Sequence, residues 1–200
     1  AEDQLYAKSA ILIEAKSGKV IFEKDADTPM YPASTTKIMT VLLGLLATED
    51  LNELVTVSYN GSKEGVRTQL DPESSVLGLK EGEKLSMLDL LYGTILRSGN
   101  DAAIAVAEHV SGSEANFVHL MNSTARAFGM SNTNFLNPHG LHQDYHYTTA
   151  RDLATLAYEA MKNETFRDIV RSDRYQMEAT NMQKERMIST GHRIMLKNYN

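Results

Sequence analysis

The amino-acid sequence predicts an α+β fold in one domain spanning residues 1–200. Three features support this prediction. Residues 9–24 alternate in a way that is typical of a β-hairpin, the middle of the chain carries apolar residues at helical spacing, and short alternating segments return near the end. Strands from the two ends can therefore pair beside a helical middle, and we expect a helical lobe over roughly residues 60–165.

The N-terminal hairpin is predicted from alternation on both sides of a turn. Ile11 and Ile13 precede the turn sequence KSGK, and Val20 and Phe22 follow it. Gly18 within this turn can adopt the positive φ that tight hairpin turns require.

The next predicted element is a helix that begins at Ser34. Its apolar residues cover nearly every face, so we expect this helix to be buried on all sides. These residues are Ile38, Met39, Val41, Leu42, Leu43, Leu45 and Leu46.

Capping residues mark several later helices. Ser86 and Asp89 have the spacing of a capping box, and Thr149 with Asp152 repeats it. Asp101 is expected to begin a further helix. The predicted helices span residues 86–97, 101–110, 114–128 and 150–162, with a short helix after Phe166. The predicted strands span residues 54–58, 175–179 and 186–190, and residues 131–148 are expected to form a long polar loop.

The composition excludes several classes of function. Of the 200 residues, 42% are hydrophobic and 23% are charged, which is ordinary for a globular domain. The formal net charge is −6 without a basic run, so we expect no nucleic-acid partner. The absence of cysteine excludes disulfides, thiolate metal sites and a cysteine nucleophile. No apolar run is long enough to predict a membrane span, and the N-terminus fits either signal-peptide cleavage or an arbitrary boundary.

The stretch MYPASTTKIMT places Ser34 three residues before Lys37. Positions i and i+3 share a helix face, so the lysine amine can reach the serine hydroxyl. Burial and the positive end of the helix dipole both disfavour an ammonium there and lower the lysine pKa. A neutral lysine can then remove the serine proton, and free backbone N–H groups at the helix start can stabilise an oxyanion. The pair is a candidate nucleophile and base, although S-x-x-K alone is more often a serine N-cap with a lysine in the first turn.

The sequence RSGNDAA supplies a second candidate motif between two predicted helices. Ser98 and Asn100 are expected in a tight turn that directs both side chains into a cleft. Ser98 can relay a proton to a leaving amine, and the Asn100 amide can hold a substrate carbonyl and contact the lysine. The plain alternative is a helix-to-helix turn capped by Asp101. The sequence SYN at 58–60 fits the S-x-N pattern equally well, but we expect it to form a turn together with the GSKEG that follows.

Histidines gather in the predicted polar loop. The sequence HGLHQDYH contains His139, His142 and His146, with Asp144 between them. Such side chains can bind zinc, but the loop gives them no helical register, so we do not expect a metal site there. No cofactor is expected.

Four segments together resemble the D-alanyl-D-alanine carboxypeptidases, the low-molecular-mass penicillin-binding protein family of serine peptidases. They are PASTTKIMT, LRSGNDAAIAVAEHVSG, FGMSNTNFLNPHGLH and TARDLATLA. The resemblance extends from the N-terminal hairpin to about residue 170, and S-x-x-K followed by S-x-N is more specific than either motif alone. It implies a fold like that of β-lactamases and transpeptidases, with an antiparallel sheet, flanking helices and a helical lobe.

The resemblance also implies a chemistry. Ser34 would be the acylated nucleophile and Lys37 its general base, with the Ser34 backbone N–H as half of the oxyanion hole. Ser98 and Asn100 would form the second motif. The substrate would be a peptidoglycan stem peptide ending in D-Ala-D-Ala, which loses its last D-alanine through an acyl-enzyme, and β-lactam antibiotics would acylate the same serine. Members of the family are exported, and many attach to the membrane through a C-terminal amphipathic helix, so the resemblance implies an extracytoplasmic location that is compatible with peripheral membrane attachment.

One element of the family has no match in the sequence. The K-T-G motif of the central strand is missing, and the nearest string, STG at 189–191, has a serine in place of the cation and comes too early. The family's remaining strands would follow residue 200. We therefore expect a C-terminally truncated catalytic domain, without the strand that binds the substrate carboxylate and supplies the second oxyanion donor.

Two alternatives stay open at this point. A β-lactamase of the same fold would use an additional glutamate to activate the deacylating water, and no segment convincingly supplies one. A catalytically inactive, penicillin-binding-like scaffold at the cell wall would fit the missing third motif. The presence of all four candidate side chains argues against the scaffold: Ser34, Lys37, Ser98 and Asn100.

Overall fold

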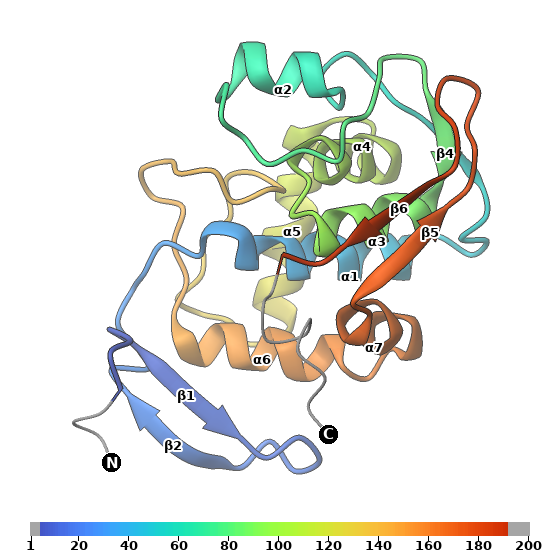
Figure 1. Ribbon diagram of the computed structural model, residues 1–200. Coiled ribbons are helices and arrows are strands. Elements are labelled where there is room, and N and C mark those ends of the chain that lie inside the picture. The colour runs from blue at the N-terminus through green and yellow to red at the C-terminus, as the bar shows by residue number, and fades with distance from the viewer. Residues whose placement is uncertain (1–4, 192–200) are drawn as a thin grey trace.

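Helix α1 (Lys37–Ala47) lies at the centre of the computed structural model, which describes residues 5–191. Five other helices contact it, so that it is enclosed by helices (Figure 1). They are α3 (Met87–Leu96), α4 (Asn100–Ser111), α5 (Glu114–Ala127), α6 (Ala150–Ala160) and α7 (Glu164–Arg171). The short helix α2 (Lys63–Gln69) lies outside this group and contacts α4.

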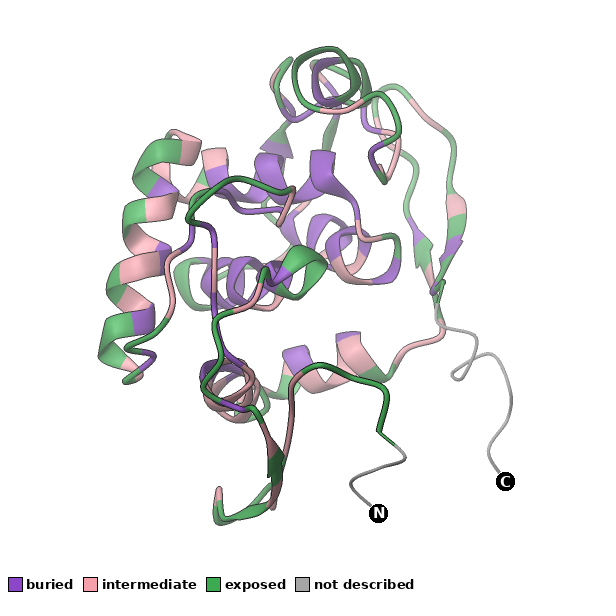
Figure 2. Cartoon of the chain, turned by 90° about the vertical axis from the view of Figure 1, so that its left-hand side faces the viewer, coloured by how far each residue is buried: buried purple, intermediate pink, exposed green. Residues whose placement is uncertain are grey.

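The central position of α1 follows from its apolar sequence. Met39 and Val41 are fully buried, and Leu42 is only 2% exposed. Figure 2 shows buried residues concentrated in the central helices, with exposed residues toward the outside. The expected burial on all sides is confirmed along most of the helix but is wrong at Leu46, which is 62% exposed.

In the described part of the chain the strands form three separate two-stranded antiparallel sheets. Strand β1 (Ala10–Ile13) pairs with β2 (Val20–Lys24), β3 (Leu54–Thr56) with β4 (Lys84–Ser86), and β5 (Arg174–Met177) with β6 (Arg186–Ser189). The first sheet is the predicted hairpin, the third pairs the two strands predicted near residues 175–179 and 186–190, and the α+β class is confirmed. The expected pairing of early with late strands is not found within residues 5–191, where the two hairpins lie apart (Figure 1).

The structure corrects two predicted elements near the site. The predicted helix from Ser34 is divided, because Ala33–Thr36 forms a 3-10 turn and α1 begins only at Lys37. The segment after SYN, expected as a turn, forms α2. Its N-cap is Ser62, whose hydroxyl accepts a hydrogen bond of 3.0 Å from the Gly65 backbone N–H.

The expected cap at Asp101 is also wrong. Gly99 occupies the N-cap position of α4, and Asp101 lies within its first turn. The Asp101 carboxylate instead accepts hydrogen bonds of 2.7–3.0 Å from three backbone N–H groups of a distant loop, at Leu77, Gly78 and Leu79. Three strong donors 22–24 positions away outweigh a local cap, and no local pattern predicts them.

Other caps agree with the prediction because they depend on near neighbours. The Ser86 hydroxyl accepts from the Asp89 N–H at the start of α3, although Ser86 also ends the unpredicted strand β4. The Thr149 hydroxyl accepts from the Asp152 N–H at the start of α6. Helix α7 begins at Glu164, earlier than expected, because the Asn163 side chain caps it.

The C-terminal hairpin packs on α3. The rings of Tyr92 and Tyr175 stack with centroids 3.8 Å apart. This contact places β5 and β6 along one side of the helical group, beside the segment that leads into β4 (Figure 1). Within residues 5–191, no helix combines the length and apolar character needed to cross a membrane.

Candidate active site

The 3-10 turn before α1 presents Ser34 to solvent. Ser34 is exposed, whereas Lys37, one helical turn later, is only 2% exposed. Ala33 has φ of 49°, a left-handed conformation that costs free energy for a residue with a Cβ. The chain thus bends sharply beside the candidate nucleophile. Backbone N–H groups at the start of such a turn lack partners within it, which fits the expected oxyanion donor.

The Lys37 amine is held between two oxygen atoms. Its Nζ lies 3.5 Å from Ser34 Oγ, which confirms that the i to i+3 spacing brings the two side chains together. Nζ also donates a hydrogen bond of 2.6 Å to the backbone carbonyl of His139. This second contact holds the amine between the serine hydroxyl and the His139 carbonyl.

Burial lowers the pKa of Lys37 to about 8, and the negative charge of Asp101 partly opposes this shift. The expected direction is therefore confirmed, and burial is its principal cause. With this pKa a useful fraction of the amine is neutral near neutral pH and can accept a proton.

The second motif meets the first across the fold. Ser98 Oγ donates a hydrogen bond of 2.8 Å to Ser34 Oγ. Ser98 itself has φ of 50°, so the predicted tight turn between α3 and α4 is present. Asn100 is 4% exposed and lines the same hollow as Ser34, but among the described residues no hydrogen bond joins its amide to Lys37.

The loop after α5 contributes a contact to Lys37 that the sequence motifs did not predict. Gly140 has φ of +87°, and a Cβ at this position would lie 1.9 Å from the carbonyl oxygen of Ala33. Only glycine therefore lets this loop approach the serine turn closely enough for the His139 carbonyl to reach Lys37. The acceptor is a backbone atom, so the sole signal in the sequence is the glycine of NPHGLH.

A hollow of about 330 Å³ opens beside Ser34. A larger hollow of about 890 Å³ has four lining residues in common with the smaller one, so the two hollows adjoin each other. The Ser74 hydroxyl at the smaller hollow is buried and has no hydrogen-bond partner among residues 5–191. The lining of the smaller hollow includes Ser34, Asp71, Ser74, Ser75, Asn100 and Leu141.

The histidines of the loop serve as hydrogen-bonding residues. His146 Nδ1 accepts from the Leu136 N–H, and its Nε2 lies 2.9 Å from Thr36 Oγ1. Burial lowers the pKa of His139 to about 3 and that of His146 to about 4, so both are neutral near pH 7. In the part of the chain that the structure describes, no group of three or more His, Asp or Glu side chains is arranged to hold a metal ion.

The chain is similar in sequence to known proteins. A model of the D-alanyl-D-alanine carboxypeptidase family matches residues 1–200. The chain is 40% identical over 163 residues to D-alanyl-D-alanine carboxypeptidase DacF of Bacillus subtilis and 42% identical over 154 residues to DacC of Escherichia coli. These matches cover 80% and 75% of this chain but only 40% and 38% of the two relatives, so the chain spans about two fifths of their length.

Solved structures show the same fold. The structure of Streptomyces K15 DD-transpeptidase superposes with a TM-score of 0.87 at 29% identity, over 96% of this chain and 76% of that one. Penicillin-binding protein 5 of Haemophilus influenzae gives a TM-score of 0.80 at 32% identity, over 90% and 52%.

Proposed function

Because this chain belongs to the D-alanyl-D-alanine carboxypeptidase family, we propose that it carries the acylation machinery of a serine DD-carboxypeptidase. The substrate would be a peptidoglycan stem peptide that ends in D-Ala-D-Ala. The observation that carries this proposal is one chain of contacts: Ser98 Oγ is 2.8 Å from Ser34 Oγ, which is 3.5 Å from the buried Lys37 Nζ. The candidate nucleophile thereby lies within reach of both a base and a second hydroxyl.

In the first half of the reaction, neutral Lys37 accepts the Ser34 hydroxyl proton while Oγ bonds to the carbonyl carbon of the penultimate D-alanine. The backbone N–H of Ser34 stabilises the resulting oxyanion. The intermediate then breaks its C–N bond, and the departing D-alanine amine receives a proton through the Ser98 hydroxyl, which Lys37 replenishes. The products are free D-alanine and an ester on Ser34.

In the second half, water attacks this ester and gives its proton to the neutral Lys37. The Ser34–acyl bond breaks, Ser34 regains its proton, and the shortened peptide leaves. Asn100, buried beside the hollow, would hold the substrate carbonyl in both halves. A β-lactam would form the same ester on Ser34. Since peptidoglycan lies outside the cytoplasmic membrane, the proposed function places the enzyme there, as a catalytic domain with a helical lobe.

The test is the intact mass of the protein, produced with any natural sequence that flanks residues 1–200, before and after benzylpenicillin. One covalent adduct is expected, and it should be absent in Ser34→Ala. The matched control is Ser58→Ala, in the second S-x-N sequence, whose hydroxyl bonds Glu108 away from the hollow. This variant should retain the adduct.

Release of D-alanine from a peptide ending in D-Ala-D-Ala is measured alongside. Rapid loss of the adduct with consumption of penicillin, and no D-alanine release, would instead identify a β-lactamase. A folded protein that gives neither adduct nor D-alanine would contradict any catalytic role and favour the inactive scaffold.

A further inference from the structure

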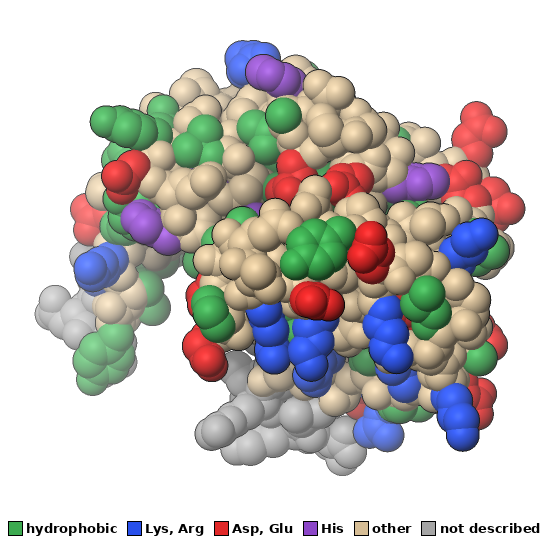
Figure 3. Space-filling model, turned by 90° about the horizontal axis from the view of Figure 1, so that it is seen from above, with side chains coloured by type: hydrophobic (Ala, Val, Ile, Leu, Met, Phe, Trp, Pro, Cys, Tyr) green, Lys and Arg blue, Asp and Glu red, His purple; other side chains and the backbone are tan. Residues whose placement is uncertain are grey.

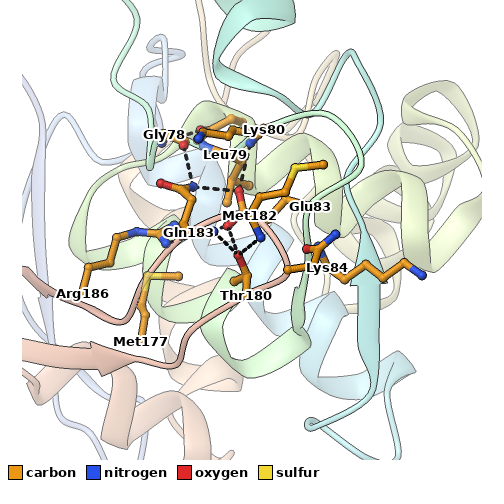
Figure 4. Close-up of polar contacts among 12 residues, drawn as sticks. Gly78, Leu79, Lys80, Glu83, Lys84, Met177, Thr180, Met182, Gln183 and Arg186 are labelled. Atoms are coloured by element: carbon orange, nitrogen blue, oxygen red, sulfur yellow. Dashed lines mark hydrogen bonds and ion pairs between the residues drawn. The ribbon is translucent and has the colours of Figure 1, made fainter.

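A buried carboxylate joins the C-terminal hairpin to the segment before β4. Glu83 has no exposed surface. Its two oxygens accept hydrogen bonds from the Thr180 hydroxyl at 2.9 Å and from Gln183 Nε2 at 2.7 Å (Figure 4). The backbone N–H of Lys80 donates to the same carboxylate at 3.0 Å, and Arg186 Nη1 lies 3.8 Å away. Four groups from two chain segments thus converge on one carboxyl group.

The hairpin turn also contacts backbone atoms on both sides of Glu83. Gln183 Nε2 donates to the Gly78 carbonyl at 3.1 Å. The Asn181 side chain donates to the Gly82 carbonyl at 3.0 Å and accepts from the Lys84 N–H at 2.8 Å. We call this set the clasp, and it consists of Glu83 with Thr180, Asn181 and Gln183.

The segment that the clasp holds is continuous with residues 74–79, which lead to the hollow beside Ser34, called the serine hollow below. The N–H groups of residues 77–79 donate to the Asp101 carboxylate, and the Asn100 N–H donates to the Ser75 carbonyl at 2.9 Å. Ser75 and Asn100 both line the hollow beside Ser34. A continuous set of hydrogen bonds therefore runs from the hairpin, through residues 74–79, to the first turn of α4.

Several positively charged side chains lie around the clasp. The hollow on its outer side is lined by Lys63, Arg67 and Lys80, as well as Arg186. Figure 3, which looks onto this end of the molecule, shows Lys and Arg side chains gathered along one edge. Glu64 and Glu81 also line that hollow, so the positive charge is partly balanced there.

We propose that the clasp positions one wall of the serine hollow, and that Glu83 and Gln183 are positioning residues for Asn100. This role rests on the proposed function of Ser34. Neither residue touches the reacting atoms. They hold residues 74–79 against α4, and thereby keep the Asn100 amide and the Ser75 backbone in place beside the nucleophile. Opening the clasp leaves Ser34 and Lys37 intact but lets the wall move.

Gln183→Ala is the principal variant, because Gln183 is only half-buried and its removal leaves the core unchanged. Glu83→Ala is the stronger variant, and Glu83→Gln keeps the shape of the side chain and one acceptor oxygen. Hydrogen exchange is followed at the amides that mark the wall, those of residues 77–79 and 100. We expect roughly tenfold faster exchange there in Gln183→Ala, since two partly buried hydrogen bonds are lost.

The second readout is the rate constant for acylation by benzylpenicillin, corrected for the folded fraction. We expect it to fall by roughly fivefold or more in Gln183→Ala, further in Glu83→Ala, and less in Glu83→Gln. Asn163→Ala is the matched control, because it removes the cap of α7 and so lowers stability without touching residues 74–84. It should alter neither readout.

The outcomes separate this proposal from the proposed function. If the unmutated protein forms no acyl-enzyme, the proposed function fails, while exchange at residues 77–79 and 100 still tests the clasp. Faster exchange confined to the hairpin would overturn the clasp proposal. So would an unchanged acylation rate in variants whose wall amides exchange faster, because the clasp would then hold the wall without affecting the site.

Discussion

Ser98 Oγ donates a hydrogen bond of 2.8 Å to Ser34 Oγ, although 64 positions separate the two serines. The contact requires the tight turn between α3 and α4, where Ser98 adopts φ of 50°. A residue held in this conformation stores strain, and such strain often marks a functional position. A test of Ser98 must therefore separate the role of its hydroxyl from the role of its backbone conformation.

Ser98→Gly should abolish most activity without destabilising the protein. Glycine tolerates the positive φ of this position, so the unfolding midpoint should equal or exceed that of the unmutated protein. Loss of the proton relay should lower kcat/KM for a D-Ala-D-Ala peptide by roughly 10²–10⁴-fold. Ser98→Ala, which keeps the strain, is the control and should show a similar kinetic loss. Full activity in Ser98→Gly would assign the proton relay elsewhere.

Acylation should accelerate as the pH rises through the pKa of Lys37. With a pKa of about 8, the neutral fraction increases from about a tenth at pH 7 to about nine tenths at pH 9. The rate constant for acylation by benzylpenicillin should therefore rise about tenfold over this range. Circular dichroism at each pH shows whether the fold is kept. A flat profile in a folded protein would contradict the role of Lys37 as the base.

Lys37→Met should remove activity and yet stabilise the protein at neutral pH. The folded pKa of about 8 lies below the ordinary value of 10.5, so the unfolded chain binds more protons between these values. Burial of the charged form costs roughly 3 kcal/mol below pH 8, and this cost disappears as the pH rises toward 10.5. Part of the gain is offset because the His139 carbonyl loses its donor.

The net effect is an increase of about 1–2 kcal/mol in the free energy of unfolding at pH 7. Urea unfolding at pH 7, 8, 9 and 10 measures this difference, and the advantage of Lys37→Met should shrink over the upper part of this range. A variant that is less stable at pH 7, or an advantage that grows with pH, would contradict a buried lysine with a lowered pKa.

Gly140→Ala should damage the site beyond the cost of its backbone conformation. Its Cβ would meet the Ala33 carbonyl oxygen at 1.9 Å, so the loop or the serine turn must move. Gly112→Ala is the matched control, since Gly112 has φ of +75° with no atom within 4 Å of the added Cβ. The control should lose about 1 kcal/mol and keep its acylation rate.

For Gly140→Ala we expect a larger loss of stability than in the control and an acylation rate lower by roughly tenfold or more. Thermal unfolding and benzylpenicillin acylation measure the two effects. Equal behaviour of the two variants would show that the loop tolerates the contact and does not position Lys37.

The local elements could be predicted because each depends on residues close together in the chain. The caps at Ser86 and Thr149 and the approach of Lys37 to Ser34 all span three positions. Helix α2 and strand β4 were missed, since their short segments carry little periodic signal. Asp101 was assigned to a cap because its true partners lie 22–24 positions away.

By itself the sequence determined the α+β class, the helical middle, the four candidate side chains and the family to which they belong. Only the tertiary structure decided that Ser98 meets Ser34, that the His139 carbonyl holds the Lys37 amine 102 positions away, and that Asp101 binds the loop beside the hollow. The physical reason is that spacing along a helix sets which neighbouring side chains share a face. Contacts across the fold depend on how the helices pack and on backbone atoms, and a backbone carbonyl carries no mark of its role in the sequence.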